Sequence, residues 1–412
     1  MVVAPDARPP RPVGLQAVLL AGATGVAQVL VAVIYILTAR STDPSSYGAI
    51  VTAIAIGTAA AGLIDFGSNA LWTREAASGR VSSTDLGARI SGKLLAAAAL
   101  ALVATVVLLL IAPAYAPAGA VLVAVLLGQS MLVPLRALRR GETVALLLLV
   151  ERVAAVAIFG LLAVAGAPAT DALWVSITIG TLLLAAAAHR LTPRAARMRF
   201  FAERPRNPWA GAGHYGVSAV AASAQQLDLP TLALVAGPAA SGLYGAVNRW
   251  TQPLQLLSTA FSSAAAPFLA QSDGWGHARR LVMRASWMLF LAVAACALLA
   301  LCAPVVVPVL LGEQYEGSVA VLQWLAWGTI PAIFNQPIAT ALQSRRYDHF
   351  VSIPWLSCVV VQLGLIVLLA PTLGALGAAI AFAVLQTLLL FALVGCLVYA
   401  VRSERRSADQ DA

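Results

Sequence analysis

The chain has 412 residues, of which 60% are hydrophobic and only 10% charged, with a mean hydropathy of +0.87 and a net charge of +9. Soluble domains carry about 25% charged residues, so this composition excludes an ordinary soluble protein and indicates one that lies in lipid. The positive charge does not indicate a nucleic-acid partner, because the basic residues avoid every second connection between the apolar segments.

Apolar runs of about 20 residues recur along the chain, and each predicts a transmembrane helix, because lipid offers no partner to an unpaired backbone group. The run after Arg11 is too long for the core of a signal peptide, so we expect it to remain as the first span. The twelve expected spans are 15–37, 48–71, 94–113, 119–138, 143–166, 172–188, 214–236, 242–268, 286–311, 319–341, 350–370 and 376–400.

The longest connection, 190–213, is basic, contains three prolines and divides the spans into six plus six. Tyr47-Gly48-Ala49 opens the second span and Tyr244-Gly245-Ala246 the eighth, at equivalent points of the two halves. The sequence therefore predicts an all-α polytopic membrane protein, with two six-helix lobes related by a pseudo-two-fold axis along the membrane normal. The predicted parts are a cytoplasmic N-terminus (1–14), an N-lobe (15–189), a basic cytoplasmic linker (190–213), a C-lobe (214–401) and a cytoplasmic tail (402–412).

All basic residues except Arg40, Arg152 and Arg249 fall in alternate connections. Lys93, the only lysine, is assigned to one of these connections, between the second and third spans. Because translocation disfavours outward movement of Lys and Arg, the basic side is predicted to be cytoplasmic. We expect a multi-pass protein of the bacterial plasma (inner) membrane with both termini in the cytoplasm. The outer connections are too short for an extracellular domain, so any binding is expected between the helices.

Five charged residues fall within the expected spans: Asp65, Glu151, Arg152, Asp228 and Arg249. A charge near the bilayer centre costs a few kcal/mol unless it is paired or hydrated, so these side chains are expected to face the bundle interior. Asp228 and Arg249 lie at nearly equal depth on adjacent antiparallel spans, which predicts that they approach each other. Such a pair is either a structural staple or a gate that opens to an anion, and the residues alone leave both open.

Pro230 follows Asp228 and removes one helical hydrogen bond, which leaves the carbonyl of Gln226 free. A loosened helix beside a carboxylate suits a cation or proton site, and a simple kink is the alternative.

Glu151 and Arg152 are neighbours in sequence and point about 100° apart on a helix, so we expect each to find its partner elsewhere. Asp65 lies near the cytoplasmic end of the second span. A local cap, or a pair with Arg74, is favoured for it over transport coupling.

Several motifs resemble one family. They are Ala39-Arg40, Tyr47-Gly48, Asp65-Phe66-Gly67 with Arg74, the segment ASGLYGAVNRW (240–250) after Asp228, VLLGEQYEGSVAVLQWLAW (309–327) and APTLGALGAAIA (370–381). In these segments the chain resembles the polysaccharide-exporter flippases (O-antigen-flippase-like) of the multidrug/oligosaccharidyl-lipid/polysaccharide superfamily. The resemblance implies two lobes that form a V, alternating access, and a lipid-pyrophosphate-linked oligosaccharide as cargo.

A pyrophosphate favours arginine partners, because a guanidinium binds its oxygens bidentately. The predicted substrate-binding residues are Arg249, Arg152, Arg40, Arg74 and Asn248, and the predicted coupling or gating residues are Asp228, Glu151 and Asp65. Expected partners are the lipid-linked sugar, membrane lipid, and polysaccharide polymerases and glycosyltransferases. Coupling to an H+ or Na+ gradient is open, and we expect no cofactor, metal or nucleic acid.

Two other functions remain. A multidrug or organic-cation antiporter of the same superfamily would favour acidic and aromatic residues in its cavity, and Glu151 and Asp228 keep it open. A membrane-embedded polysaccharide polymerase or glycosyltransferase is disfavoured, so we expect no enzyme activity. The outer connections offer that chemistry only four acidic residues on short loops: Asp43, Asp171, Glu313 and Glu316.

Overall fold

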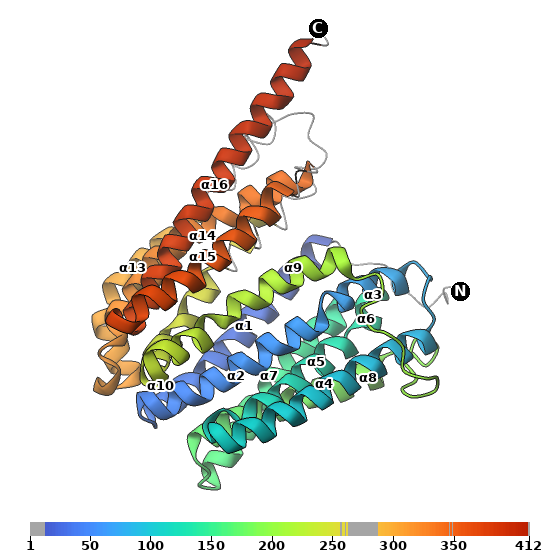
Figure 1. Cartoon of the computed structure of the whole chain (residues 1–412), viewed down its shortest axis with the longest axis horizontal. Coiled ribbons are helices and arrows are strands. Elements are labelled where there is room, and N and C mark those ends of the chain that lie inside the picture. Colours follow the sequence, from blue (N-terminus) through green and yellow to red (C-terminus); the bar gives the residue numbers. More distant parts are fainter. Residues whose placement is uncertain are drawn as a thin grey trace. The chain divides into compact units, whose positions relative to one another are not determined.

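The protein is represented by a computed structural model that describes residues 13–255, 258–259, 261–262, 287–345, 347 and 349–410. The regular structure in these ranges is helical, and none of these residues forms a strand. The chain divides into two compact units, Met1–Pro230 (unit 1) and Thr231–Ala412 (unit 2), coloured from blue to yellow-green and from there to red in Figure 1. The predicted cytoplasmic arginines outside the described residues are Arg8, Arg11, Arg279, Arg280, Arg284 and Arg346.

The helices of unit 1 follow the expected spans. They are α1 (Val13–Arg40), α2 (Pro44–Asp65), α3 (Ser68–Ala77), α4 (Ser83–Ile111), α5 (Pro117–Met131), α6 (Val133–Ala137), α7 (Gly141–Val164), α8 (Ala169–Leu191) and α9 (Gly213–Ala224), with short 3-10 helices η1 (Pro113–Tyr115) and η2 (Gln225–Leu227). Small residues permit close packing between them. For example, Gly57 on α2 lies directly against the Ala118 carbonyl of α5, where a Cβ would clash.

The second span ends earlier than the sequence predicted. Helix α2 stops at Asp65 because Phe66 (φ 45°) and Gly67 (φ 69°) both adopt left-handed backbone conformations, which no helix can continue through. The chain then turns into the short helix α3. The predicted span 48–71 therefore combines the end of one helix, a sharp corner and the beginning of another.

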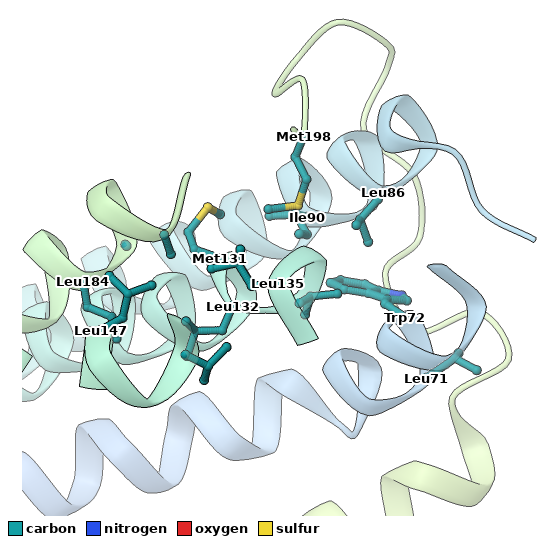
Figure 2. Close-up of a cluster of buried hydrophobic side chains, with 14 of the residues drawn as sticks. Leu71, Trp72, Leu86, Ile90, Met131, Leu132, Leu135, Leu147, Leu184 and Met198 are labelled. Carbon is teal, nitrogen blue, oxygen red and sulfur yellow. The ribbon is translucent and has the colours of Figure 1, made fainter. Parts of the chain in front are cut away.

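The main core of unit 1 lies where this corner meets α6 and the first turns of α4 (Figure 2). Trp72 of α3 is fully buried there, in the same cluster as Leu135 of α6 and Ile90 of α4. Met198 and Ala212, which belong to the linker, are buried in the same cluster. The linker is thus part of the core of unit 1.

Residues 198–212 of the linker, here called the linker strap, lie across α4. The Phe201 N–H donates to Ser91 Oγ (3.2 Å) and the Arg206 N–H donates to the Ala88 carbonyl (3.2 Å). The Trp209 indole N–H donates to the Ile64 carbonyl at the end of α2 (2.7 Å). These bonds fix the strap to two helices of unit 1.

The compact units divide at Pro230, whereas the predicted lobes divide at the linker, 190–213. The difference arises because α9, the first part of the expected seventh span, packs along α2 in unit 1. Gly216 of α9 lies directly against the ring of Phe66, and Ser223 lies against Gly62 of α2. Whether the membrane lobes divide at the linker stays a prediction.

Unit 2 contains the remaining helices. They are most of α10 (Asp228–Asn248), η3 (Arg249–Thr251), α13 (Trp287–Leu311), η4 (Glu313–Tyr315), α14 (Ser318–Ser344), α15 (His349–Leu373) and α16 (Ala375–Gln410). Helix α10 is interrupted at Gly237 (φ 81°, ψ 171°), a conformation that glycine adopts readily, and Pro238 starts a new helical segment. The break lies at the predicted end of the seventh span.

Among the described residues, nine helical stretches are long and apolar enough, by length and composition, to cross a membrane. Helix α14 is not one of them, although it has 27 residues, because its amides and tryptophans lower its hydropathy. It packs against both α13 and α16. Its Asn335 donates from Nδ2 to the Oε1 of Gln386 (3.0 Å) on α16, so this amide joins two helices.

Candidate functional site

Lys93 of α4 has a fully buried side chain in a polar cluster of unit 1. Its ammonium group donates to three oxygens, and it lies 4.1 Å from the ring centre of Trp72. The acceptors are Asp65 Oδ1 (2.7 Å), Ser68 Oγ (3.0 Å) and Asn69 Oδ1 (2.9 Å). An ammonium has three donors, so every one of them is used. The cluster ties the corner between α2 and α3 to α4.

This cluster corrects the prediction for Asp65. Its ion-pair partner is Lys93 rather than Arg74, although the local bond that it accepts from the Ser68 hydroxyl (3.1 Å) is cap-like, as expected. Lys93 was wrongly assigned to a polar connection. The signal that could have found it is its rarity, since one lysine among many arginines stands at the edge of an apolar run.

Glu151 and Arg152 occupy the middle of α7, and here too one prediction was wrong. The two residues form an ion pair, with Arg152 Nη2 3.8 Å from Glu151 Oε2. The backbone directions do diverge, but the long arginine side chain reaches back to its neighbour. The expected partner from another helix also exists for Glu151, because Thr181 of α8 donates its hydroxyl to Glu151 Oε1 (2.6 Å).

The two members of this pair differ in exposure. The Glu151 side chain is 4% exposed, whereas that of Arg152 is 32% exposed. Arg152 is the twelfth of the 24 residues of α7, so its guanidinium lies near the middle of a helix long enough to span a membrane. A charge exposed to lipid at that depth costs several kcal/mol. We therefore expect Arg152 to face a polar space.

The other predicted arginines of unit 1 lie apart from this pair. Arg40 is exposed as the last residue of α1, and Arg74 is exposed on α3. Helix α2, which has 22 residues and a length of about 33 Å, separates the two positions. They therefore lie at opposite ends of unit 1, and the structure does not bring them together.

Asp228 begins α10, directly after the 3-10 helix η2. This irregular stretch ends at Leu227, three residues before Pro230, so the predicted loosening of the helix beside Asp228 is confirmed. The Asp228 carboxylate accepts the N–H of Leu229 (2.7 Å).

Asn248 and Arg249 lie in unit 2, where α10 gives way to η3. Both side chains are half-buried. Because Asp228 belongs to unit 1 and Arg249 to unit 2, their predicted approach concerns two different units and stays a prediction.

Neither a family model nor a curated protein matches the sequence. Among solved structures, the chain is similar to the lipid II flippase MurJ in an inward closed conformation, with a TM-score of 0.74 at 10% identity over 92% of this chain and 87% of that one. It is similar to an inward-facing multidrug resistance transporter of the MATE family, with a TM-score of 0.63 at 17% identity over 96% and 99% of the two chains. A MOP superfamily transporter from Pyrococcus furiosus gives a TM-score of 0.54 at 17% identity over 94% and 95%.

These likenesses extend over nearly the whole of each chain, and they confirm the predicted class: an all-α polytopic membrane protein with twelve transmembrane helices in two lobes. The motifs quoted from the sequence point to the same superfamily. The chain therefore has the fold that MurJ shares with the MATE transporters of the multidrug/oligosaccharidyl-lipid/polysaccharide superfamily.

Proposed function

We propose that this protein is a transporter that moves a polyprenyl-(pyro)phosphate-linked oligosaccharide from the inner to the outer leaflet by alternating access, for cell-surface polysaccharide synthesis. The setting is the bacterial plasma membrane, with both termini in the cytoplasm. The cargo would be made and used by glycosyltransferases and a polysaccharide polymerase. The transport itself breaks no covalent bond and needs no catalytic residue.

Arg152 is the observation that carries this proposal. It presents a partly exposed guanidinium halfway along α7, and its only ion pair that the structure describes is a 3.8 Å contact. A phosphate oxygen at hydrogen-bond distance would be a stronger partner than this carboxylate, because charge-assisted bonds from a guanidinium form at about 2.7–2.9 Å. An anionic head group can therefore compete for Arg152, while the polyprenyl tail stays in the bilayer.

The likeness to a lipid II flippase supports the same class of cargo. Arg74 on α3 and Arg40 at the end of α1 would receive the phosphate before and after its passage, and Arg249 and Asn248 would be further phosphate-binding residues. Glu151 and Asp228 would serve coupling or gating, since one carboxylate lies beside a loosely paired arginine and the other beside a broken helix. The driving gradient would be H+ or Na+.

An Arg152→Gln variant tests the proposal in proteoliposomes that contain a fluorescent polyprenyl-pyrophosphate-linked sugar. We expect the rate of translocation to fall by about 10- to 100-fold, which corresponds to the roughly 1.5–3 kcal/mol of a bond to a charged group. Arg152→Lys should retain part of the rate. Arg139→Gln is the matched control, because Arg139 is an exposed arginine outside α7.

The second candidate is an organic-cation antiporter, which the MATE likeness and the buried Glu151 favour. It predicts that Arg152→Gln leaves lipid translocation unchanged, whereas Glu151→Gln abolishes ethidium efflux driven by a cation gradient. That pair of results would replace the flippase proposal. Glycosyl transfer by the purified protein would overturn both transport functions.

A further inference from the structure

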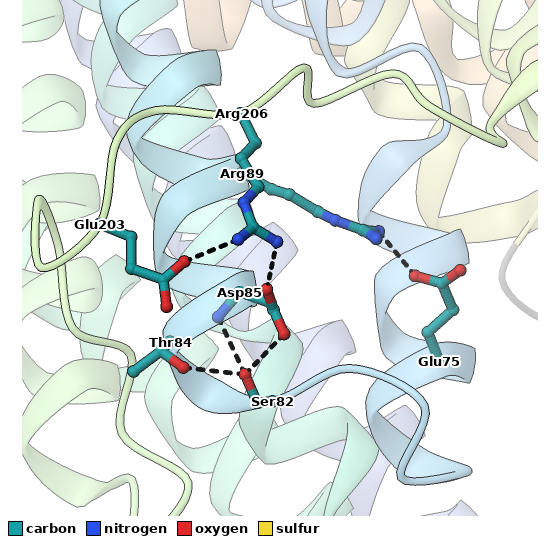
Figure 3. Close-up of polar contacts among 7 residues, drawn as sticks. All are labelled: Glu75, Ser82, Thr84, Asp85, Arg89, Glu203 and Arg206. Carbon is teal, nitrogen blue, oxygen red and sulfur yellow. Dashed lines mark hydrogen bonds and ion pairs between the residues drawn. The ribbon is translucent and has the colours of Figure 1, made fainter.

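At one end of unit 1, three acidic residues, Glu75, Asp85 and Glu203, are already paired with arginines (Figure 3). This basic end comprises α3, α6, the first turns of α4 and the linker strap. Glu75 accepts from Arg89 (2.7 Å), and Arg206 bridges Asp85 (2.5 Å) and Glu203 (2.9 Å).

Arginines of the linker remain without such compensation. Arg194, Arg199 and Arg204 are exposed, and none of them has a hydrogen bond or ion pair with another residue that the structure describes. Arg199 and Arg204 lie on the linker strap itself. The strap is fixed to α4 by its backbone, so these two side chains add positive charge at a defined place rather than on a loose tether.

We expect this place to lie at the level of the lipid head groups. The strap crosses α4 at Ala88 and Ser91, and the long apolar run of α4 begins at Leu94. Beyond that point α4 is the least buried of the candidate spans, because only 11% of its apolar stretch is buried, so we expect lipid to surround it. Phospholipids that surround α4 would therefore bring their phosphates next to the strap.

Phe201 supplies an apolar contact at the same point. Its backbone adopts a left-handed conformation (φ 53°), which is uncommon for an aromatic residue, and its N–H is held by Ser91 Oγ. The side chain is 61% exposed. An exposed aromatic ring between two arginines suits the boundary between head groups and acyl chains.

We propose that the linker strap, together with the first turns of α4, binds the phosphate of an anionic phospholipid of the surrounding leaflet. Arg199 and Arg204 contact the head group and Phe201 lies against the start of the acyl chains. The basis is charge complementarity, since juxtamembrane basic residues attract anionic lipids. The inference does not depend on the transported cargo, because the site faces the lipid around α4.

Native mass spectrometry of the full-length protein, released from detergent and titrated with phosphatidylglycerol or phosphatidylcholine, tests this site. The wild type should bind phosphatidylglycerol more tightly than phosphatidylcholine. The Arg199→Gln/Arg204→Gln variant should bind phosphatidylglycerol roughly 25-fold more weakly, from about fivefold for each arginine near the surface. Both side chains are exposed and unpaired among the described residues, so the variant should fold normally; its melting temperature in phosphatidylcholine checks this.

Arg139→Gln/Arg140→Gln is the matched control, because it removes the same charge from the corner between α6 and α7. It should bind phosphatidylglycerol like the wild type. Equal losses in both double variants would show attraction to overall charge and overturn the site, as would unchanged binding in the strap variant. Displacement of phosphatidylglycerol by geranylgeranyl pyrophosphate at equal concentration would assign the strap to the cargo instead.

Discussion

Two ion pairs in unit 1 are built in opposite ways. At the corner of α2 and α3, Lys93 is fully buried and lies 2.7 Å from Asp65, with every donor of its ammonium used. In the middle of α7, Arg152 is 32% exposed and lies 3.8 Å from Glu151. The first pair has no capacity for another ligand, whereas the second leaves most donors of a guanidinium available.

This difference indicates that the first pair stabilises the fold and that the second is available for binding. A buried charge whose hydrogen bonds are complete contributes to the architecture, and its removal leaves its partner uncompensated. A charge that is loosely paired at membrane depth is costly unless something polar reaches it. The sequence shows that these four residues are charged but not how closely or how completely they are paired, so the distinction rests on distance and exposure.

The largest expected effect is at the first pair. Asp65→Asn should destabilise the protein by about 3–5 kcal/mol, because it leaves the Lys93 ammonium buried without a counter-charge. The measurement is the unfolding of the detergent-solubilised protein, followed by tryptophan fluorescence.

A double variant sharpens this test. Asp65→Asn/Lys93→Met should be more stable than Asp65→Asn alone, since it removes the uncompensated charge as well. If the double variant is the less stable of the two, the Asp65–Lys93 pair does not hold the corner.

A smaller effect is expected at Asp43, an exposed carboxylate at the start of α2 that is stabilised by backbone amides instead of a cation. The pKa of Asp43 lies below its ordinary value of 3.8 because its carboxylate accepts hydrogen bonds. The bond from the Ser46 backbone amide (2.9 Å) has the largest effect, and bonds from the Ser46 side chain and the Ser45 amide add to it. Asp43→Ala should cost about 1 kcal/mol through loss of the cap.

The same pKa predicts a pH dependence. Because the folded state holds the proton less tightly than the unfolded state, the stabilisation by Asp43 is complete above pH 3.8 and is lost as the pH falls towards the lowered pKa. The Asp43→Asn variant, which retains the cap, should lack this contribution. Identical acid unfolding profiles of this variant and the wild-type protein would contradict it.

The smallest effect on stability is expected at the second pair. Glu151→Gln keeps an acceptor for the Thr181 hydroxyl, and it breaks only a 3.8 Å contact with a partly exposed guanidinium, so it should cost less than about 1 kcal/mol. A loss as large as that of Asp65→Asn would mean that Glu151 and Arg152 belong to the framework, and the argument from Arg152 to an anionic cargo would fail.

The sequence by itself determined the class of fold. Long apolar runs in a chain with few charges have one stable solution in lipid, and the helices α7, α8 and α13 lie close to their predicted spans. The likeness to MurJ and MATE transporters confirms that class. Pro230 also marked the loosened helix before it, whereas the backbone conformation of the break at Gly237 was not predicted.

Only the tertiary structure decided which charges meet. Lys93 and Asp65 are 28 residues apart, and Thr181 lies 30 residues from Glu151, so these contacts depend on how separate helices pack. The attachment of the linker to α4 likewise joins residues more than 100 positions apart. Helical periodicity predicts which face of the helix a side chain occupies. It does not predict the partner of a long side chain such as that of Arg152, because that partner depends on which groups lie nearby once the helices have packed.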